Sequence, residues 1–130
     1  MLKRKGVIID KNIHETTIIV VDILNAEDIL TYLFRVNVEA EFREIRDILK
    51  QNLRIKDKYC KADVSNKARN VYEMRFTKAG KNDRIYCQEL HTNKKRFIIM
   101  CELFEGKKSQ EIPKKIKSRL ETIGAYEYEL

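Results

Sequence analysis

Four basic side chains of this sequence are of the types that bind phosphate. Arg75 and Arg84 stand a few residues on either side of one turn, and Lys107 and Lys108 closely follow an apolar run. A guanidinium grips two phosphate oxygens with its planar fork, whereas a lysine ammonium acts as a mobile point charge. If the segments that carry these residues are neighbouring strands, the four cations meet at one corner of a sheet. The sequence therefore predicts a corner that holds phosphate.

Three segments in the second half of the chain have the pattern of strands. VYEMRFT (71–77) and RIYCQEL (84–90) alternate apolar and polar residues, and RFIIMCELF (96–104) is nearly all apolar. Alternation indicates a half-buried strand, and a continuous apolar run indicates a central strand covered on both faces. The turns between the three segments are short, which predicts an antiparallel meander.

The remaining segments predict helices that cover this sheet. The β-branched run at 16–24 indicates a strand, with 7–10 forming a hairpin with it, and residues 54–70 are polar and irregular. Apolar residues at helical spacing in 26–52 predict a helical hairpin or one bent helix, and those in 112–123 predict a last helix. We therefore expect an α+β fold with a small antiparallel β-sheet (β-α-α-β-β-β-α), the N-terminal helices packed on one face and a C-terminal helix.

Composition favours one domain over residues 1–130, with a short N-terminal β extension. The formal net charge is +7 and the pI is about 9.3, so the partner is acidic, most commonly a nucleic acid, or the surface is merely rich in solvated lysine. Cys60, Cys87 and Cys101 form no CxxC pair, which indicates a reducing, cytoplasmic compartment. His14 and His91 lack the spacing of a metal site, so we expect no metal and no cofactor. No apolar run is long enough to span a membrane.

The second half of the chain resembles a known family. VYEMRF, RIYCQEL and the stretch LFEGKKSQEIPKKIKSRL are similar to motifs of the RelE/ParE superfamily of bacterial toxins, most closely its HigB-like, phage-derived branch. The likeness covers about residues 70–120 and implies a RelE-like fold. It implies the toxin of a type II toxin-antitoxin system: a ribosome-dependent mRNA endonuclease (mRNA interferase) that inhibits translation. Its expected partners are mRNA on the ribosome and a cognate helix-turn-helix-type antitoxin.

The resemblance also implies which residues act. Cleavage of RNA through its 2′-hydroxyl needs cations beside the scissile phosphate and a group that transfers protons, but no metal ion. We expect catalysis from Arg84, Arg75, Lys107 and Tyr126. Other basic residues are expected to bind RNA phosphates: Lys108, Lys94, Lys95, Arg96 and Lys114.

Two other functions remain open at this point. One is a non-catalytic member of the same fold that binds a protein, as ParE-like gyrase inhibitors do, or a degenerate interaction module. The other is a basic RNA-binding domain unrelated to toxins.

Overall fold

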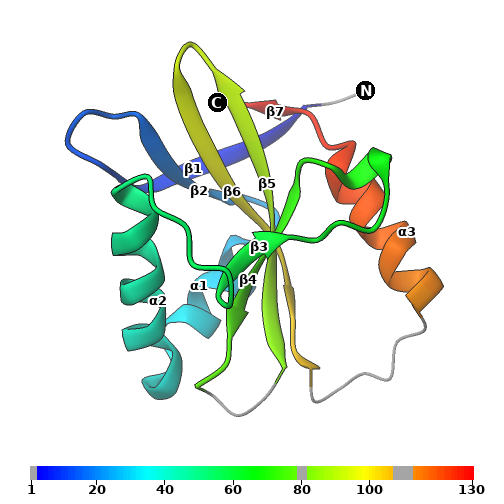
Figure 1. Cartoon of the computed structure of the whole chain (residues 1–130), viewed down its shortest axis with the longest axis horizontal. Coiled ribbons are helices and arrows are strands. Elements are labelled where there is room, and N and C mark those ends of the chain that lie inside the picture. The colour runs from blue at the N-terminus through cyan, green and yellow to red at the C-terminus, as the bar shows by residue number, and fades with distance from the viewer. Residues whose placement is uncertain (1–2, 79–81, 107–112) are drawn as a thin grey trace.

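Seven strands form one twisted sheet in the computed structural model, which describes residues 3–78, 82–106 and 113–130 (Figure 1). The strands are β1 (Arg4–Lys11), β2 (Thr17–Asp22), β3 (Tyr59–Lys61), β4 (Val71–Phe76), β5 (Asp83–Thr92), β6 (Lys95–Phe104) and β7 (Tyr128–Glu129). The helices are α1 (Ala26–Leu33), α2 (Val36–Lys50) and α3 (Pro113–Gly124), with a 3-10 turn, η1 (Asn66–Ala68). The order across the sheet is β3-β4-β5-β6-β2-β1-β7.

The prediction of a small antiparallel sheet is wrong, because the sheet is larger and mixed. β2 pairs with β6 in parallel, and β1 pairs in parallel with β7. All six residues of β2 are buried, so its sequence carries no alternation from which a position or direction could be read. β3 has three residues and lies in a stretch that we expected to be irregular, and β7 has two residues and follows the last predicted helix. Such short strands form only because a neighbouring strand offers its free edge.

Other expected elements are present. β4, β5 and β6 are consecutive antiparallel neighbours, which confirms the predicted meander. The hairpin of β1 with β2 is confirmed as well. Ile99 and Cys101 of β6 are fully buried, as a central strand requires.

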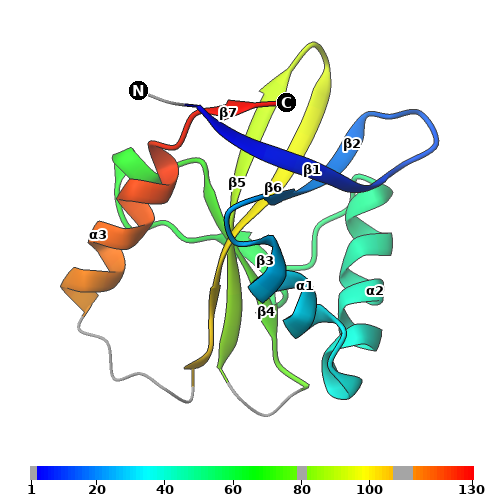
Figure 2. The same cartoon turned by 180° about the vertical axis from the view of Figure 1, so that it is seen from behind.

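Each face of the sheet has its own apolar core. On one face, called here the helix-pair face, α1 and α2 pack on residues such as Met74, Ile85 and Cys87. On the other, the α3 face, α3 packs on residues such as Val71 and Tyr86 (Figures 1 and 2). Because side chains alternate along a strand, the odd- and even-numbered residues of β5 point to different cores.

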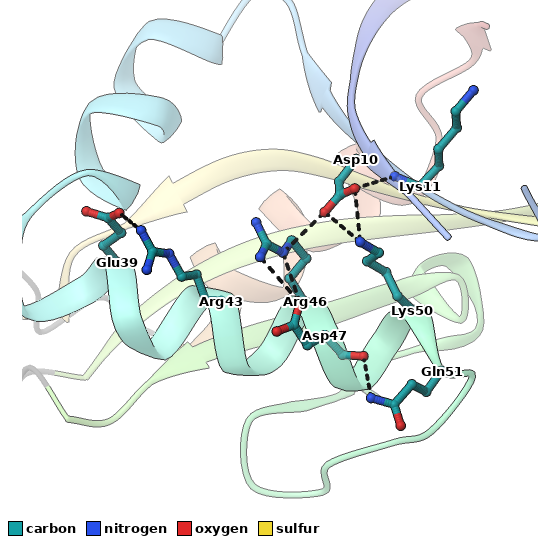
Figure 3. A network of polar contacts seen from close by, with 8 residues as sticks. All are labelled: Asp10, Lys11, Glu39, Arg43, Arg46, Asp47, Lys50 and Gln51. Atoms are coloured by element: carbon teal, nitrogen blue, oxygen red, sulfur yellow. Dashed lines mark hydrogen bonds and ion pairs between the residues drawn. The ribbon is translucent and has the colours of Figure 1, made fainter. Parts of the chain in front are cut away.

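An ionic cluster fixes the β1–β2 hairpin to α2. Asp10, next to a bulge in β1, lies 3.2 Å from Arg46 Nε and 3.2 Å from Lys50 Nζ (Figure 3). Asn12 in the hairpin turn also donates from its amide to the carbonyl of Lys50. These contacts hold the hairpin turn next to the C-terminal end of α2. No helix in the described ranges is long and apolar enough to cross a membrane.

Candidate phosphate-binding site

Arg75 and Arg84 share one buried carboxylate. They lie directly opposite each other on β4 and β5, on the α3 face. Glu73 Oε2 accepts from Arg75 Nη2 at 2.8 Å and Nε at 3.1 Å, and Glu73 Oε1 accepts from Arg84 Nη1 at 2.9 Å. The Glu73 side chain is 7% exposed, against 39% for Arg75 and 23% for Arg84. The carboxylate thus sits below two guanidiniums that reach the surface.

Glu73, Arg75 and Arg84 together carry a positive charge. The hydrogen bond to Glu73 raises the pKa of Arg75 above its already high ordinary value. Two guanidiniums against one carboxylate carry a net charge of +1, and the carboxylate fixes their positions before any ligand arrives. Arg84 is held from a second side, since its Nη2 donates to Asn82 at 2.9 Å. Its buried Nε has no acceptor in the described part of the chain.

Gly106 lies against Asn82 and Asp83, the two residues that precede Arg84. Gly106 donates its backbone N–H to Asp83 Oδ1 at 2.9 Å, and the other oxygen of Asp83 accepts from Tyr32 at 2.9 Å. A Cβ on Gly106 would lie only 2.4 Å from the carbonyl oxygen of Asn82, so only glycine permits this approach. The two lysines expected at this corner, Lys107 and Lys108, lie outside the described residues.

The helix α3 adds a further cation to the same face. Arg119 lies over the ring of Phe104 with its guanidinium carbon 5.9 Å from the ring centroid, and Phe104 stands opposite Arg84 on β6. Lys114 is exposed on the first turn of α3. A phosphate chain that lay along this face would therefore meet arginines from β4, β5 and α3.

Tyr126 does not join the arginine pair. Arg4 lies over its ring at 3.9 Å from the centroid, and the ring meets that of Tyr128 edge-on at 6.2 Å. Its backbone carbonyl accepts from Gln88 in β5. Burial raises the pKa of the Tyr126 phenol. These contacts hold the segment after α3 against the sheet.

The remaining predicted residues lie at the other end of β5. Lys94 lies in the β5–β6 turn, and Lys95 and Arg96 are the first residues of β6, whereas the arginine pair lies next to the β4–β5 turn (Figure 1). Lys94, Lys95 and Arg96 were expected to bind RNA phosphates. The structure places them apart from the arginine pair, in a second basic region.

Sequence reasoning missed the carboxylates that organise both regions. Glu73 is two residues from Arg75, so the alternation of VYEMRF already puts the two on one face. Glu89 is five residues further along β5 than Arg84, and nothing in its sequence context marks it as an organiser. In the described ranges, no three His, Cys, Asp or Glu residues lie close enough to hold a metal ion.

The chain matches no protein-family model, no curated protein and no solved structure.

Proposed function

We propose that this protein is an RNA-directed toxin that binds mRNA on the ribosome and cleaves it without a metal ion. The observation that carries the proposal is the pair Arg75 and Arg84, held in fixed positions by Glu73 on an open part of the α3 face. Both guanidiniums reach the surface there, and a scissile phosphate would bind between them. A cognate antitoxin that covered this face would silence the protein.

The arginine pair suits the chemistry of RNA cleavage. When a ribose 2′-hydroxyl attacks the adjacent phosphorus, it gives its proton to solvent water, negative charge grows on the non-bridging oxygens of the phosphate, and the 5′-oxygen leaves and takes up a proton from water. Fixed cations stabilise that charge without having to reorganise during the reaction. Arg84 and Arg75 would supply them, and Glu73, which accepts three hydrogen bonds from the two arginines, acts as a positioning residue.

One observation favours a second candidate, a non-catalytic member of the toxin class that binds its target and blocks it. Both oxygens of Glu73 already accept hydrogen bonds from the arginines, and Tyr126 is packed beneath Arg4. Binding through the arginine pair needs no proton transfer. The two candidates differ in whether the transcripts are cut.

Induced expression of the protein and its variants in bacteria tests the proposal. We expect growth arrest with transcripts cut in the ribosome-bound fraction. Arg84→Ala should slow cleavage by about 30- to 1000-fold, the loss of about 2–4 kcal/mol of transition-state stabilisation. The matched control is Arg43→Ala, which removes an equally charged but 62% exposed side chain on α2 (Figure 3).

Melting temperatures establish that each variant is folded. Arrest with intact transcripts would favour the non-catalytic candidate. If folded Arg84→Ala arrests growth as strongly as the parent protein and Arg43→Ala, the arginine pair is not the site.

A further inference from the structure

A second basic site lies at the β5–β6 turn. A hollow of about 650 Å³ is bounded there by residues 91–96, which are the turn and the strand ends beside it, by Thr16 in the β1–β2 hairpin and by Asn52 after α2. Asn93 and Lys94 have φ angles of 51° and 62°, as in the tight two-residue turns that connect antiparallel strands. Lys94 in the turn and Lys95 at the start of β6 both line the hollow, and both are exposed.

The side of the hollow opposite the turn is held in place by hydrogen bonds. Asn12 Oδ1 accepts from the backbone N–H groups of Thr16 at 2.8 Å and Thr17 at 3.1 Å. Thr17 Oγ1 in turn donates to Asn52 Oδ1 at 2.7 Å, which connects the hairpin to the residues after α2. The hollow is therefore formed by parts of the chain whose relative positions are fixed.

A buried carboxylate contacts two residues that line the hollow, Arg96 and His91. Glu89, 5% exposed, accepts from Tyr59 Oη at 2.6 Å and from Arg96 Nη2 at 2.7 Å, both on its Oε2. Burial by itself would raise the pKa of Glu89, but the hydrogen bonds from Arg96 and Tyr59 bring the pKa below its ordinary value. The carboxylate is therefore ionised at neutral pH and fixes the guanidinium of Arg96.

Arg96 has donor capacity that the protein does not use. Its side chain is 10% exposed, and it lines the hollow. Glu89 takes one Nη donor, and the buried Nε has no acceptor in the described ranges of the chain. Neither Lys94 nor Lys95 forms an ion pair with a described residue. Lys95 has a longer-range electrostatic interaction with Glu15. The hollow thus has an excess of positive charge.

His91 adds a different kind of group. Its Nε2 lies 3.0 Å from Glu89 Oε1. In the neutral imidazole, the Nε2–H donates to this carboxylate, which leaves Nδ1 as a hydrogen-bond acceptor. His91 lines the hollow and its side chain is 61% exposed, so this acceptor is open to a ligand. Cations beside one hydrogen-bond acceptor suit a ligand that carries a phosphate next to a hydroxyl group.

We propose that this hollow binds a ribose phosphate: Lys94, Lys95 and Arg96 hold the phosphate, and His91 accepts a hydrogen bond from a ribose hydroxyl. The site is separate from the arginine pair. His91 follows Arg84 by seven positions on β5, about 23 Å along the strand, and faces the helix-pair side instead of the α3 side. The proposal goes beyond the proposed function, because it needs neither cleavage nor a toxin. The ribose phosphate comes from an RNA strand or from a free nucleotide.

Binding measurements on the whole chain test this site. The probes are a short fluorescein-labelled single-stranded RNA, followed by fluorescence anisotropy, the DNA of the same sequence, and AMP as competitor. In Lys94→Ala with Lys95→Ala, the affinity for RNA should fall about tenfold at low salt. The salt slope of binding should shrink by about 1.4, because two phosphate contacts are lost. The matched control, Lys61→Ala with Lys67→Ala, removes two exposed lysines that do not line the hollow, and it should bind like the parent.

The ribose contact has its own test. His91→Ala should reduce the preference for RNA over DNA by about three- to tenfold, the loss of one hydrogen bond. If AMP at millimolar concentration displaces the RNA, the free nucleotide is the ligand; if only RNA binds, the strand is. Equal RNA and DNA affinities in the parent protein, or a turn variant that binds like its control, would overturn the proposal. The same measurements are repeated in Arg84→Ala, which lacks one arginine of the proposed cleavage site. They show whether RNA binds at the β5–β6 turn independently of the proposed function.

Discussion

Replacing Glu73 by glutamine tests whether Arg75 and Arg84 are built to hold an anion. The substitution keeps the size of the side chain but removes the negative charge that the two guanidiniums share. If the arginines converge on a phosphate position, an anion from solution should bind to the two guanidiniums and replace the negative charge that Glu73 supplied. The prediction is that Glu73→Gln is destabilised and that inorganic phosphate restores much of the loss.

The size of the loss follows from the contacts. Glu73 accepts three charge-assisted hydrogen bonds. Buried bonds of this kind contribute about 1.5–3 kcal/mol each. Both arginines are partly exposed, at 39% and 23%, so solvent screening reduces each bond to about 1 kcal/mol. The glutamine oxygen retains one of the three, which leaves a net loss of about 2 kcal/mol. For a chain of this size, that lowers the melting temperature by about 8 °C.

The stabilisation of Glu73→Gln expected from bound phosphate can be calculated as well. A ligand at ten times its dissociation constant stabilises the folded state by RT ln 11, about 1.4 kcal/mol, or about 5 °C. Thermal melts in phosphate and in chloride at equal ionic strength separate anion binding from screening. Phosphate also stabilises proteins in general because it is excluded from their surfaces, so a control is needed.

Glu41→Gln is that control. Glu41, 1% exposed on α2, accepts from the backbone N–H groups of Thr77 and Lys78 and pairs with Lys58. Its loss should destabilise the protein to a similar extent without creating a pair of converging guanidiniums. If phosphate stabilises both variants equally, the arginine pair does not form an anion site and the reasoning behind the proposed function fails.

Two further predictions concern buried ionisable groups. Burial raises the pKa of Cys101 to about 12 and raises that of Cys87 as well, whereas Cys60 is partly exposed. A thiol-exchange reagent at about pH 8 should therefore modify Cys60 alone in the folded protein, and all three thiols in denaturant; equal rates for the three would contradict the buried positions. Because the folded-state pKa of Glu89 is lowered, its contribution to stability is present above the ordinary value of 4.5 and is lost as the pH falls below it. Glu89→Gln should thus cost about 3 kcal/mol at pH 7, since it leaves the buried Arg96 without its carboxylate, and the unfolding curves of parent and variant should converge below about pH 4.5.

Elements whose own residues show a regular pattern, such as alternation, were predictable from the sequence. The alternation in 71–77 and 84–90, with a short turn between them, was enough to predict that β4 and β5 are antiparallel neighbours. The parallel pairing of β2 with β6 was not, because pairing between distant segments leaves no mark in a run that is apolar throughout. β7 shows the same limit, since its two residues are a strand only because β1 offers an edge.

The candidate sites were also predictable from the sequence only in part. That Arg75 and Glu73 share a face follows from their spacing alone. That Arg84 reaches the same carboxylate depends on the register of β4 against β5, in which Arg75 stands opposite Arg84. Lys94, Lys95 and Arg96 were expected to bind RNA phosphates, but their distance from the arginine pair could not be predicted, because it depends on the length of β5.

The distribution of charge distinguishes the proposed sites from the rest of the basic surface. Many of the basic residues are balanced by nearby carboxylates: Arg46 and Lys50 contact Asp10, and Arg46 also contacts Asp47, so two cations face two carboxylates. At the two proposed sites, cations outnumber the nearby carboxylates. Glu73 is shared by two arginines, and Glu89 pairs with Arg96, whereas Lys94 and Lys95 form no ion pair with a described residue. Cations that no carboxylate balances repel one another. The surplus at these two places is therefore the feature that an anionic ligand would balance.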